Sequence, residues 1–282
     1  MGLWRTSSED RRRRPFLTKE TGIRLLEMFV GGIIFLVLLQ VLLGFSVFDA
    51  TFWARFWNSY TRGLVGTLVF TAIIIPVSVV IGFLGGWARV SRHRVASWPV
   101  AVYVDFFRGI PPLVLIIFAY LFGQDFLPPR VFGRGGAYTV AALALALHSG
   151  AYQVEIFRAG FQSIPRGQME AAHAVGMGQW QSMRHIILPQ TLRLSLPPLA
   201  NEFATVIKDT SLLGVVGATE MFALAQEFQQ QMVTFGIGPL VWVFSVWTSV
   251  ALTYFVMTFL VTRVLLALEH RFHTPGLEAL SL

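Results

Sequence analysis

The sequence SIPRGQMEAAHAVGMGQWQSMRHIILP, residues 163–189, interrupts a largely hydrophobic chain with charged, polar and small side chains, and is called here the polar segment. Pro165 suits the first turn of a helix, and Gly176 favours the left-handed conformation that ends one. A second short helix over Trp180–Leu188 is expected to stop at Pro189, which cannot continue a helix without losing a hydrogen bond. The pattern predicts two short helices joined by a tight turn, bound by a partner outside the membrane.

The composition surrounding this segment is that of an integral membrane protein. Of 282 residues, 55% are hydrophobic and 13% charged, with a mean hydropathy of +0.62. Such a chain is too apolar for a soluble domain and too long for a simple anchor. The net charge of +7 lies mostly between hydrophobic stretches, so it indicates membrane topology and not nucleic-acid binding. Without cysteine, the chain has no disulfide, thiolate catalyst or cysteine metal site.

About six stretches are long enough to span a bilayer, since ~20 helical residues cross a hydrocarbon core of ~30 Å. Backbone hydrogen bonds must be satisfied internally in lipid, and alternating strand patterns are absent, so an all-α polytopic bundle is expected. A basic tail at residues 1–24 precedes an uncleaved first span at residues 25–48, and a polar tail occupies residues 272–282. The further spans are expected at Leu64–Trp87, Pro99–Phe122, Ala137–Phe157, Leu196–Val216 and Pro239–Leu268.

The arginines predict the orientation of these spans, because basic residues are enriched in cytoplasmic loops. If the N-terminus is cytoplasmic, only Arg55, Arg62, Arg130 and Arg134 fall outside. The cytoplasmic set is Arg89, Arg92, Arg94, Arg158, Arg166, Arg184, Arg193, Arg263 and Arg271, besides the run Arg11–Arg14. Both termini and the polar segment are therefore expected in the cytoplasm.

Small and breaking residues indicate where helices touch or bend. Gly82 and Gly86 share one helix face, as do Ala142 and Ala146, and such pairs let a neighbouring helix approach closely or occur by chance. Within the third span, the stretch Gly109–Pro112 predicts a helix that breaks and resumes.

Charged residues inside the expected spans are costly and need partners. Asp105 and Arg108 lie three residues apart, as do Glu155 and Arg158, so each pair can form an ion pair on one helix face.

The fifth span contains Asn201, Glu202, Lys208 and Asp209 in an otherwise apolar sequence. A buried lysine costs at least ~2.5 kcal/mol on insertion scales, so Lys208 requires a partner or water. Either a broken span lines a polar passage there, or Lys208 forms a structural ion pair with another helix.

No catalytic constellation is visible in the sequence. Neither Lys19 nor Lys208 follows a glycine-rich phosphate loop, so this chain is not expected to hydrolyse ATP or bind a cofactor. The histidines lack a helical metal-ligand pattern with carboxylates, and no serine triad is indicated. The sequence therefore predicts a chain that is not an enzyme.

A family resemblance rests on the polar segment and its flanks. Glu170-Ala171-Ala172, Gly176, Ile186 and Leu188-Pro189 resemble the EAA loop of inner-membrane permeases of binding-protein-dependent ABC importers. FRGIPPLV (107–114), SGAYQVEIFRAGFQSIPRGQ (149–168) and IKDTSLLGVVG (207–217) are similar to the polar amino acid branch. The likeness covers residues 63–271, leaving the first span as an addition, and departs from the branch at Pro112 and His173.

This resemblance implies a type I ABC importer permease domain over residues 60–271, with coupling helices that dock on a cytoplasmic ABC ATPase dimer. Glu170 would make a charged contact, Ala171 and Ala172 would permit close approach, Gly176 would form the turn, and Pro189 would close the loop. ATP and Mg would be bound by the ATPase. The other implied partners are a periplasmic or extracellular substrate-binding protein and a second permease chain, identical or related, within the lipids of the cell inner membrane.

The expected function is import of a polar amino acid. The polar groups available for a substrate pathway are Gln153, Glu155, Asn201, Lys208 and Asp209. Alternatives are a permease for another small solute, such as an opine or a short peptide, a membrane scaffold with a docking loop, and a self-contained channel or ion-driven carrier.

Overall fold

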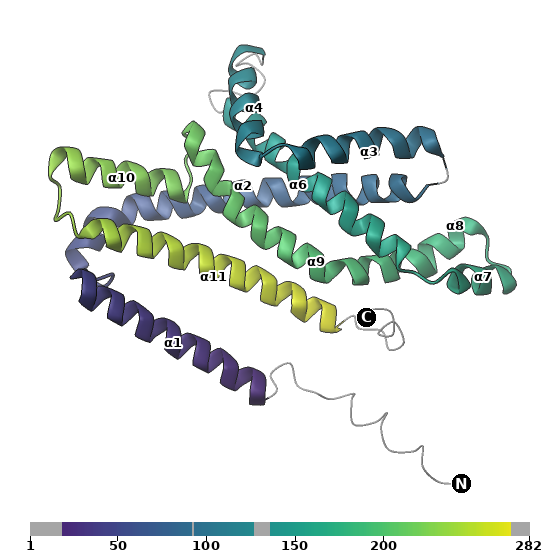
Figure 1. Ribbon diagram of the computed structural model, residues 1–282, viewed down its shortest axis with the longest axis horizontal. Helices are drawn as coiled ribbons and strands as arrows, with labels where there is room; N and C mark the ends of the chain where they lie inside the picture. Colours follow the sequence, from purple (N-terminus) through teal and green to yellow (C-terminus); the bar gives the residue numbers. More distant parts are fainter. Residues whose placement is uncertain (1–18, 92, 127–135, 272–282) are drawn as a thin grey trace, which may run out of the picture.

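The longest helix, α2 (Ala50–Val90), extends along most of the molecule in the computed structural model, which describes residues 19–91, 93–126 and 136–271 (Figure 1). It begins well before the expected span because the Asp49 carboxylate caps it, accepting hydrogen bonds from the amides of Thr51 (2.8 Å) and Phe52 (3.3 Å). Its 41 residues correspond to roughly 60 Å of helix. α2 is therefore long enough to reach past both faces of a bilayer.

Helix α1 (Lys19–Leu43) precedes α2 and lies at the edge of the molecule (Figure 1). From Val30 onward its apolar side chains are largely exposed, and Gly44, with φ of 66°, ends it. Exposed apolar residues around a helix are typical of contact with lipid. The run Arg11–Arg14, most of the expected basic tail and the tail 272–282 lie outside the described residues.

The core is built where α2 packs on α6 (Gly136–Gln162). A Cβ atom at Gly82 would collide with Gln153, and one at Gly86 would lie 2.5 Å from the Cβ atom of Phe157. The prediction of a close helix contact at these glycines is confirmed, and the approaching helix is α6. Ala142 and Ala146 of α6 are also buried, within a hydrophobic cluster that includes Ile74, Ile116, Val206 and Leu213.

The third expected span is broken, as Gly109–Pro112 predicts. Helix α3 (Arg94–Gly109) and helix α4 (Pro112–Phe126) meet at a bend of 103°. Pro111 has no amide to donate to the Phe107 carbonyl, and His148 replaces it, with Nδ1 2.9 Å from that oxygen. Because a carbonyl only accepts, Nδ1 is the protonated ring nitrogen. The break is thus stabilised by a side chain from α6.

The fifth span changes its helix type at the predicted position. Helix α9 (Leu188–Asp209) gives way to the 3-10 helix η4 (Thr210–Val216), which ends at Gly217 with φ of 84°. The expected spans leave residues 217–238 between the fifth and the sixth, yet the structure places helix α10 (Met221–Phe235) there. The last helix, α11 (Trp242–Arg271), packs along α9 and α10.

Helix α10 is anchored by close contacts that its sequence does not reveal. A Cβ atom at Gly63 of α2 would lie 2.8 Å from the Cα atom of Met221, so the two backbones nearly touch. Glu220 caps α10, accepting from the amides of Phe222 (2.8 Å) and Ala223 (2.6 Å), and also from the Tyr254 hydroxyl of α11 (3.0 Å). Glu220 is fully buried, and its carboxylate joins α10 to α11.

Among the described residues, α2, α6 and α11 are each long and apolar enough to cross a membrane, and the bent pair α3–α4 qualifies as a fourth candidate. The described apolar part of α1, Val30–Leu43, is shorter. Helix α9 is not among these candidates, and it contains Arg193, Glu202, Lys208 and Asp209.

Candidate functional site

The polar segment forms the first of the two expected short helices and the turn that follows it. Helix α7 (Arg166–Ala174) ends at Gly176, whose φ is 83°. The Gly176 amide donates to the His173 carbonyl (2.9 Å) and the Met177 amide to the Ala172 carbonyl (3.0 Å), the paired bonds of a Schellman motif. Helix α8 (Gln179–Ser182) follows, started by the Gln181 side chain, which accepts from the Gly178 amide at 2.9 Å. The predicted tight turn at Gly176 is confirmed.

The prediction that the second helix stops at Pro189 is wrong. The chain remains helical from α8 through the π-helical turn η3 (Met183–Ile187) into α9, with Pro189 in the first turn of α9. The Leu188 amide donates to the Met183 carbonyl, five residues back. This wide turn precedes the proline ring and makes room where a normal α-helical turn would clash with it. Helix α8 is therefore continuous with a long helix of the bundle.

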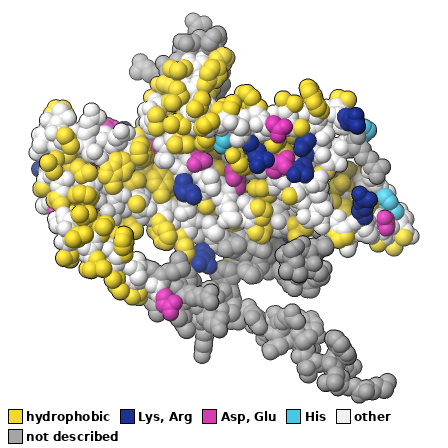
Figure 2. Space-filling model, viewed as in Figure 1, with side chains coloured by type: hydrophobic (Ala, Val, Ile, Leu, Met, Phe, Trp, Pro, Cys, Tyr) yellow, Lys and Arg dark blue, Asp and Glu magenta, His cyan; other side chains and the backbone are white. Residues whose placement is uncertain are grey.

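The outer face of α7 exposes Glu170, Ala171 and His173, whereas Ala172 is only 2% exposed. A small residue at 172 therefore serves packing within this chain. Of the Glu170-Ala171-Ala172 motif, Glu170 and Ala171 are the positions exposed for contact with a partner. Figure 2 shows basic, acidic and histidine side chains gathered at this end of the molecule.

Beneath the polar segment lies a hydrophobic cluster that joins it to the bundle. Its buried members are Phe157 and Phe161 of α6, Ile187 of η3 and Leu199 of α9. Met169 of α7 packs against the same cluster. The segment is thus seated on α6 and α9 as well as linked to both through the backbone.

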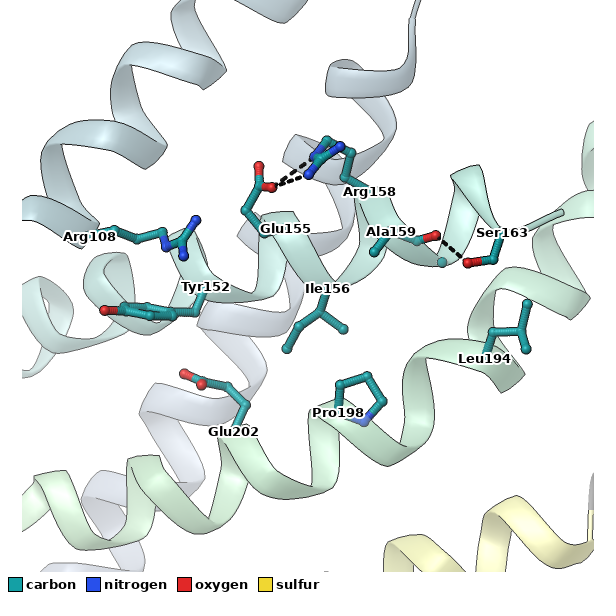
Figure 3. A pocket seen from close by; sticks show the side chains of 11 residues that line it. Arg108, Tyr152, Glu155, Ile156, Arg158, Ala159, Ser163, Leu194, Pro198 and Glu202 are labelled. Atoms are coloured by element: carbon teal, nitrogen blue, oxygen red, sulfur yellow. Dashed lines mark hydrogen bonds and ion pairs between the residues drawn. The ribbon is translucent and has the colours of Figure 1, made fainter. Parts of the chain in front are cut away.

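A cavity of about 590 Å³ opens between α6 and α9, beside the polar segment (Figure 3). Its charged groups are Arg108 from α3, Glu155 and Arg158 from α6, and Glu202 from α9. Tyr152, Ile156, Ala159, Gly160, Ser163, Leu194 and Pro198 complete the lining.

The ionic contacts in this cavity are centred on Glu155. Its Oε2 accepts from Arg158 at 2.8 and 2.5 Å, which confirms the predicted pair, and its Oε1 lies 3.8 Å from Nε of Arg89 on α2. The predicted pair between Asp105 and Arg108 is not formed. The Arg108 guanidinium lies instead over the Tyr152 ring, 5.0 Å from its centroid, because the end of α3 is turned toward α6 (Figure 3).

A chain of buried hydrogen bonds supports the cavity wall. The Ser149 hydroxyl donates to Glu202 (2.7 Å), while the Gln153 amide nitrogen donates to Ser149 (3.1 Å) and to Ser78 of α2 (2.7 Å). Gln153 is fully buried and does not line the cavity. Its placement fixes Ser149, and through Ser149 the carboxylate of Glu202.

The other candidate pathway residues lie apart from this cavity. Asn201 and Lys208 are exposed and Asp209 is half-buried, and none of them lines it. Within the described ranges Lys208 forms no ion pair with another helix. Lys208 and Asp209 instead occupy the end of α9 where the 3-10 turn begins.

Sequence reasoning missed Arg108, Tyr152 and Glu202 as members of one cavity. Glu202 was visible as a charge within an apolar span, but its partner Ser149 lies 53 positions away. The spacing of Ser149 and Gln153 by four residues was the available local signal, since it places both on one face of α6.

Together, the fold and the site define a multi-pass α-helical membrane protein with an exposed helical pair at one end and a charged cavity beside it. A family model described as "Binding-protein-dependent transport system inner membrane component" matches residues 78–274. The chain belongs to this family, and the expected all-α permease fold is confirmed.

Individual relatives agree with this assignment. The glutamine transport system permease protein GlnP of Escherichia coli strain K12 is 34% identical over 207 residues, covering 73% of this chain and 89% of that protein. The nopaline transport system permease protein NocQ of Agrobacterium fabrum is 35% identical over 173 residues, covering 58% and 73%. The crystal structure of an amino acid ABC transporter with histidines superposes with a TM-score of 0.65 at 28% identity, covering 77% and 96%.

Proposed function

We propose that this chain is the permease subunit of an ATP-driven importer for polar amino acids. The observation that carries the proposal is the exposed face of α7, at Glu170 and Ala171, presented by a segment that continues directly into α6 and α9. A partner that displaces this segment displaces both helices, and these helices line the charged cavity. Packed interfaces switch between discrete states, which suits such transmission.

The proposal includes the partners and the orientation. A cytoplasmic ABC ATPase dimer binds ATP and Mg and contacts the polar segment, while a second permease chain and a substrate-binding protein complete the assembly. Both termini and the polar segment lie on the cytoplasmic side of the inner membrane. Residues 60–271 form the permease domain, and residues 25–48 add a span to it.

Copurification tests the docking surface. A Glu170→Arg variant is expected to lose the ATPase subunit that copurifies with the unmodified chain, because it reverses the charge on the exposed face of α7. Glu227→Arg is the matched control, since Glu227 is an exposed carboxylate on α10, at the other end of the molecule (Figure 1). Equal recovery of the ATPase with both variants would remove Glu170 from the interface.

The cavity suits a zwitterionic solute. Arg108 offers a cation and Glu202 a carboxylate on opposite walls, so one ligand with an ammonium and a carboxylate group can meet both (Figure 3). Glu155 is already paired with Arg158. Gln153 does not line the cavity and affects it through its hydrogen bond to Ser149. Lys208 and Asp209 belong to a second part of the pathway, at the junction of α9 with η4, and Asn201 belongs to it from about two turns earlier on α9.

A Lys208→Met variant tests that second part. Uptake by the assembled transporter is expected to fall by about tenfold at unchanged protein level, because an exposed ammonium at a helix break is removed. Lys19→Met provides the control, as the chain has no other lysine. Undiminished uptake by the Lys208 variant would exclude this residue from the pathway.

Another small solute is the second candidate, favoured by the similarity to the nopaline permease. Competition of labelled glutamine uptake by unlabelled amino acids, nopaline and dipeptides separates these substrate classes. A scaffold without transport activity would show no uptake with any of them.

A further inference from the structure

Two tryptophans join the polar segment to a helix that is distant in the sequence. The rings of Trp180 on α8 and Trp87 near the end of α2 are stacked, with centroids 6.0 Å apart and planes inclined by 16°. Trp87 also packs edge-on against Phe83 (5.8 Å, 72°) and lies 6.5 Å from Phe161 of α6. Trp180 is thereby attached to an aromatic group that is seated between α2 and α6.

The hydrogen bonds of α8 do not provide this attachment. They connect Gly178 with Gln181 and Ser182, and Gln181 with His185, so all of them stay within the polar segment. The backbone links the segment to α6 and α9, but not to α2. Among the described residues, the ring contact from α8 to α2 is the one between Trp180 and Trp87.

Helix α2 is well placed to receive a displacement at Trp87. On either side of Trp87 along α2, Gly82 and Gly86 closely approach Gln153 and Phe157, and Arg89 lies 3.8 Å from Glu155. These contacts make α2 and α6 one packed unit next to the cavity. A force applied through Trp87 would therefore reach the cavity wall by a route separate from α9.

We propose that the Trp180–Trp87 stack is a positioning contact that sets the orientation of the polar segment on α2 and passes its displacement to the α2–α6 unit. This inference rests on the proposed coupling function. Trp180 as a whole is 62% exposed, so a direct contact with the ATPase or with lipid headgroups is the competing role. Substituting Trp87 distinguishes the two roles. Trp87 is half-buried beneath Trp180, so its loss breaks the stack without removing the exposed ring of Trp180.

The experiment uses the assembled transporter in proteoliposomes and measures two rates, ATP hydrolysis and uptake of labelled glutamine, histidine and arginine. Trp180→Ala and Trp87→Ala are each expected to lower the substrate transported per ATP by about fivefold while the ATPase stays bound. The double variant should be no worse than either single one, because both remove the same contact. Trp180→Phe should recover most of the ratio, since it keeps an aromatic face.

Trp98→Ala is the matched control, because Trp98 is similarly exposed (70%) on α3 and makes no ring contact within the described residues. Variants are compared at equal yield and melting temperature, with Trp87→Phe replacing Trp87→Ala if the latter is unstable. A deficit confined to Trp180→Ala, or losses that multiply in the double variant, would overturn the positioning role. If the unmodified chain recovers no ATPase, the proposed function fails instead, which keeps the two results distinguishable.

Discussion

Replacing Gly176 by valine is expected to abolish substrate uptake while ATP hydrolysis continues. Gly176 has a φ of 83°, a conformation that costs an L-residue ~1–2 kcal/mol and a β-branched residue more. No neighbouring atom lies within 4 Å of the position of a Cβ atom, so the penalty comes from the backbone alone. The turn would relax, the two bonds of the Schellman motif would be lost, and α7 would change its angle to α8.

The measurement is the ratio of uptake to ATP hydrolysis in proteoliposomes. Gly167→Val provides the control, since Gly167 also has open space around it but lies inside α7, without a positive φ. Gly176→Asn should be milder, because asparagine tolerates the left-handed region. An unchanged ratio in the Gly176→Val variant, at normal protein level, would show that the shape of this turn does not matter for coupling.

Loss of the Glu220 carboxylate is expected to be the most destabilising single change outside the polar segment. Glu220→Ala leaves the part-buried amides of Phe222 and Ala223 without their acceptor and removes the hydrogen bond from the Tyr254 hydroxyl. At ~1–3 kcal/mol for each of the two amides, the free energy of unfolding should fall by about 2–6 kcal/mol. Helix α10 should separate first from α2 and α11.

The melting temperature in detergent and the rate of proteolysis within α10 report this loss. Glu227→Ala removes an exposed carboxylate from the same helix, where it accepts only from Gln231 at 3.1 Å, and should have little effect. Glu220→Gln keeps an acceptor oxygen, so its melting temperature should lie between those of Glu220→Ala and Glu227→Ala. Similar melting temperatures for Glu220→Ala and Glu227→Ala would mean that the buried cap contributes little.

The local features of this fold were accessible from the sequence because single residues determine them. Gly176 needs a left-handed backbone, Gly109–Pro112 cannot sustain a helix, and Gly82 with Gly86 permits one close neighbour. Each of these predictions needs no knowledge of the partner helix, and each is confirmed by the structure.

The predictions that were wrong or missing depend on contacts with residues that are distant in the sequence or on the geometry of the preceding turn. Pro189 was expected to end a helix, but the π turn before it removes the clash. Helix α10 was missed, since its stability depends on contacts such as Met221 with Gly63 and Glu220 with Tyr254. Arg108 was expected to pair with Asp105, but the packing of α3 on α6, which the sequence does not reveal, places its guanidinium over Tyr152.

The π turn at Met183–Ile187 also determines the helical phase of α9. A π turn holds one residue more than an α-helical turn, and one residue rotates every following side chain by ~100° about the axis. The face on which Glu202 meets Ser149 is therefore chosen about four turns earlier, beside α8. Substitutions in this turn that keep its length preserve the phase, whereas a one-residue deletion would rotate the whole wall of the cavity.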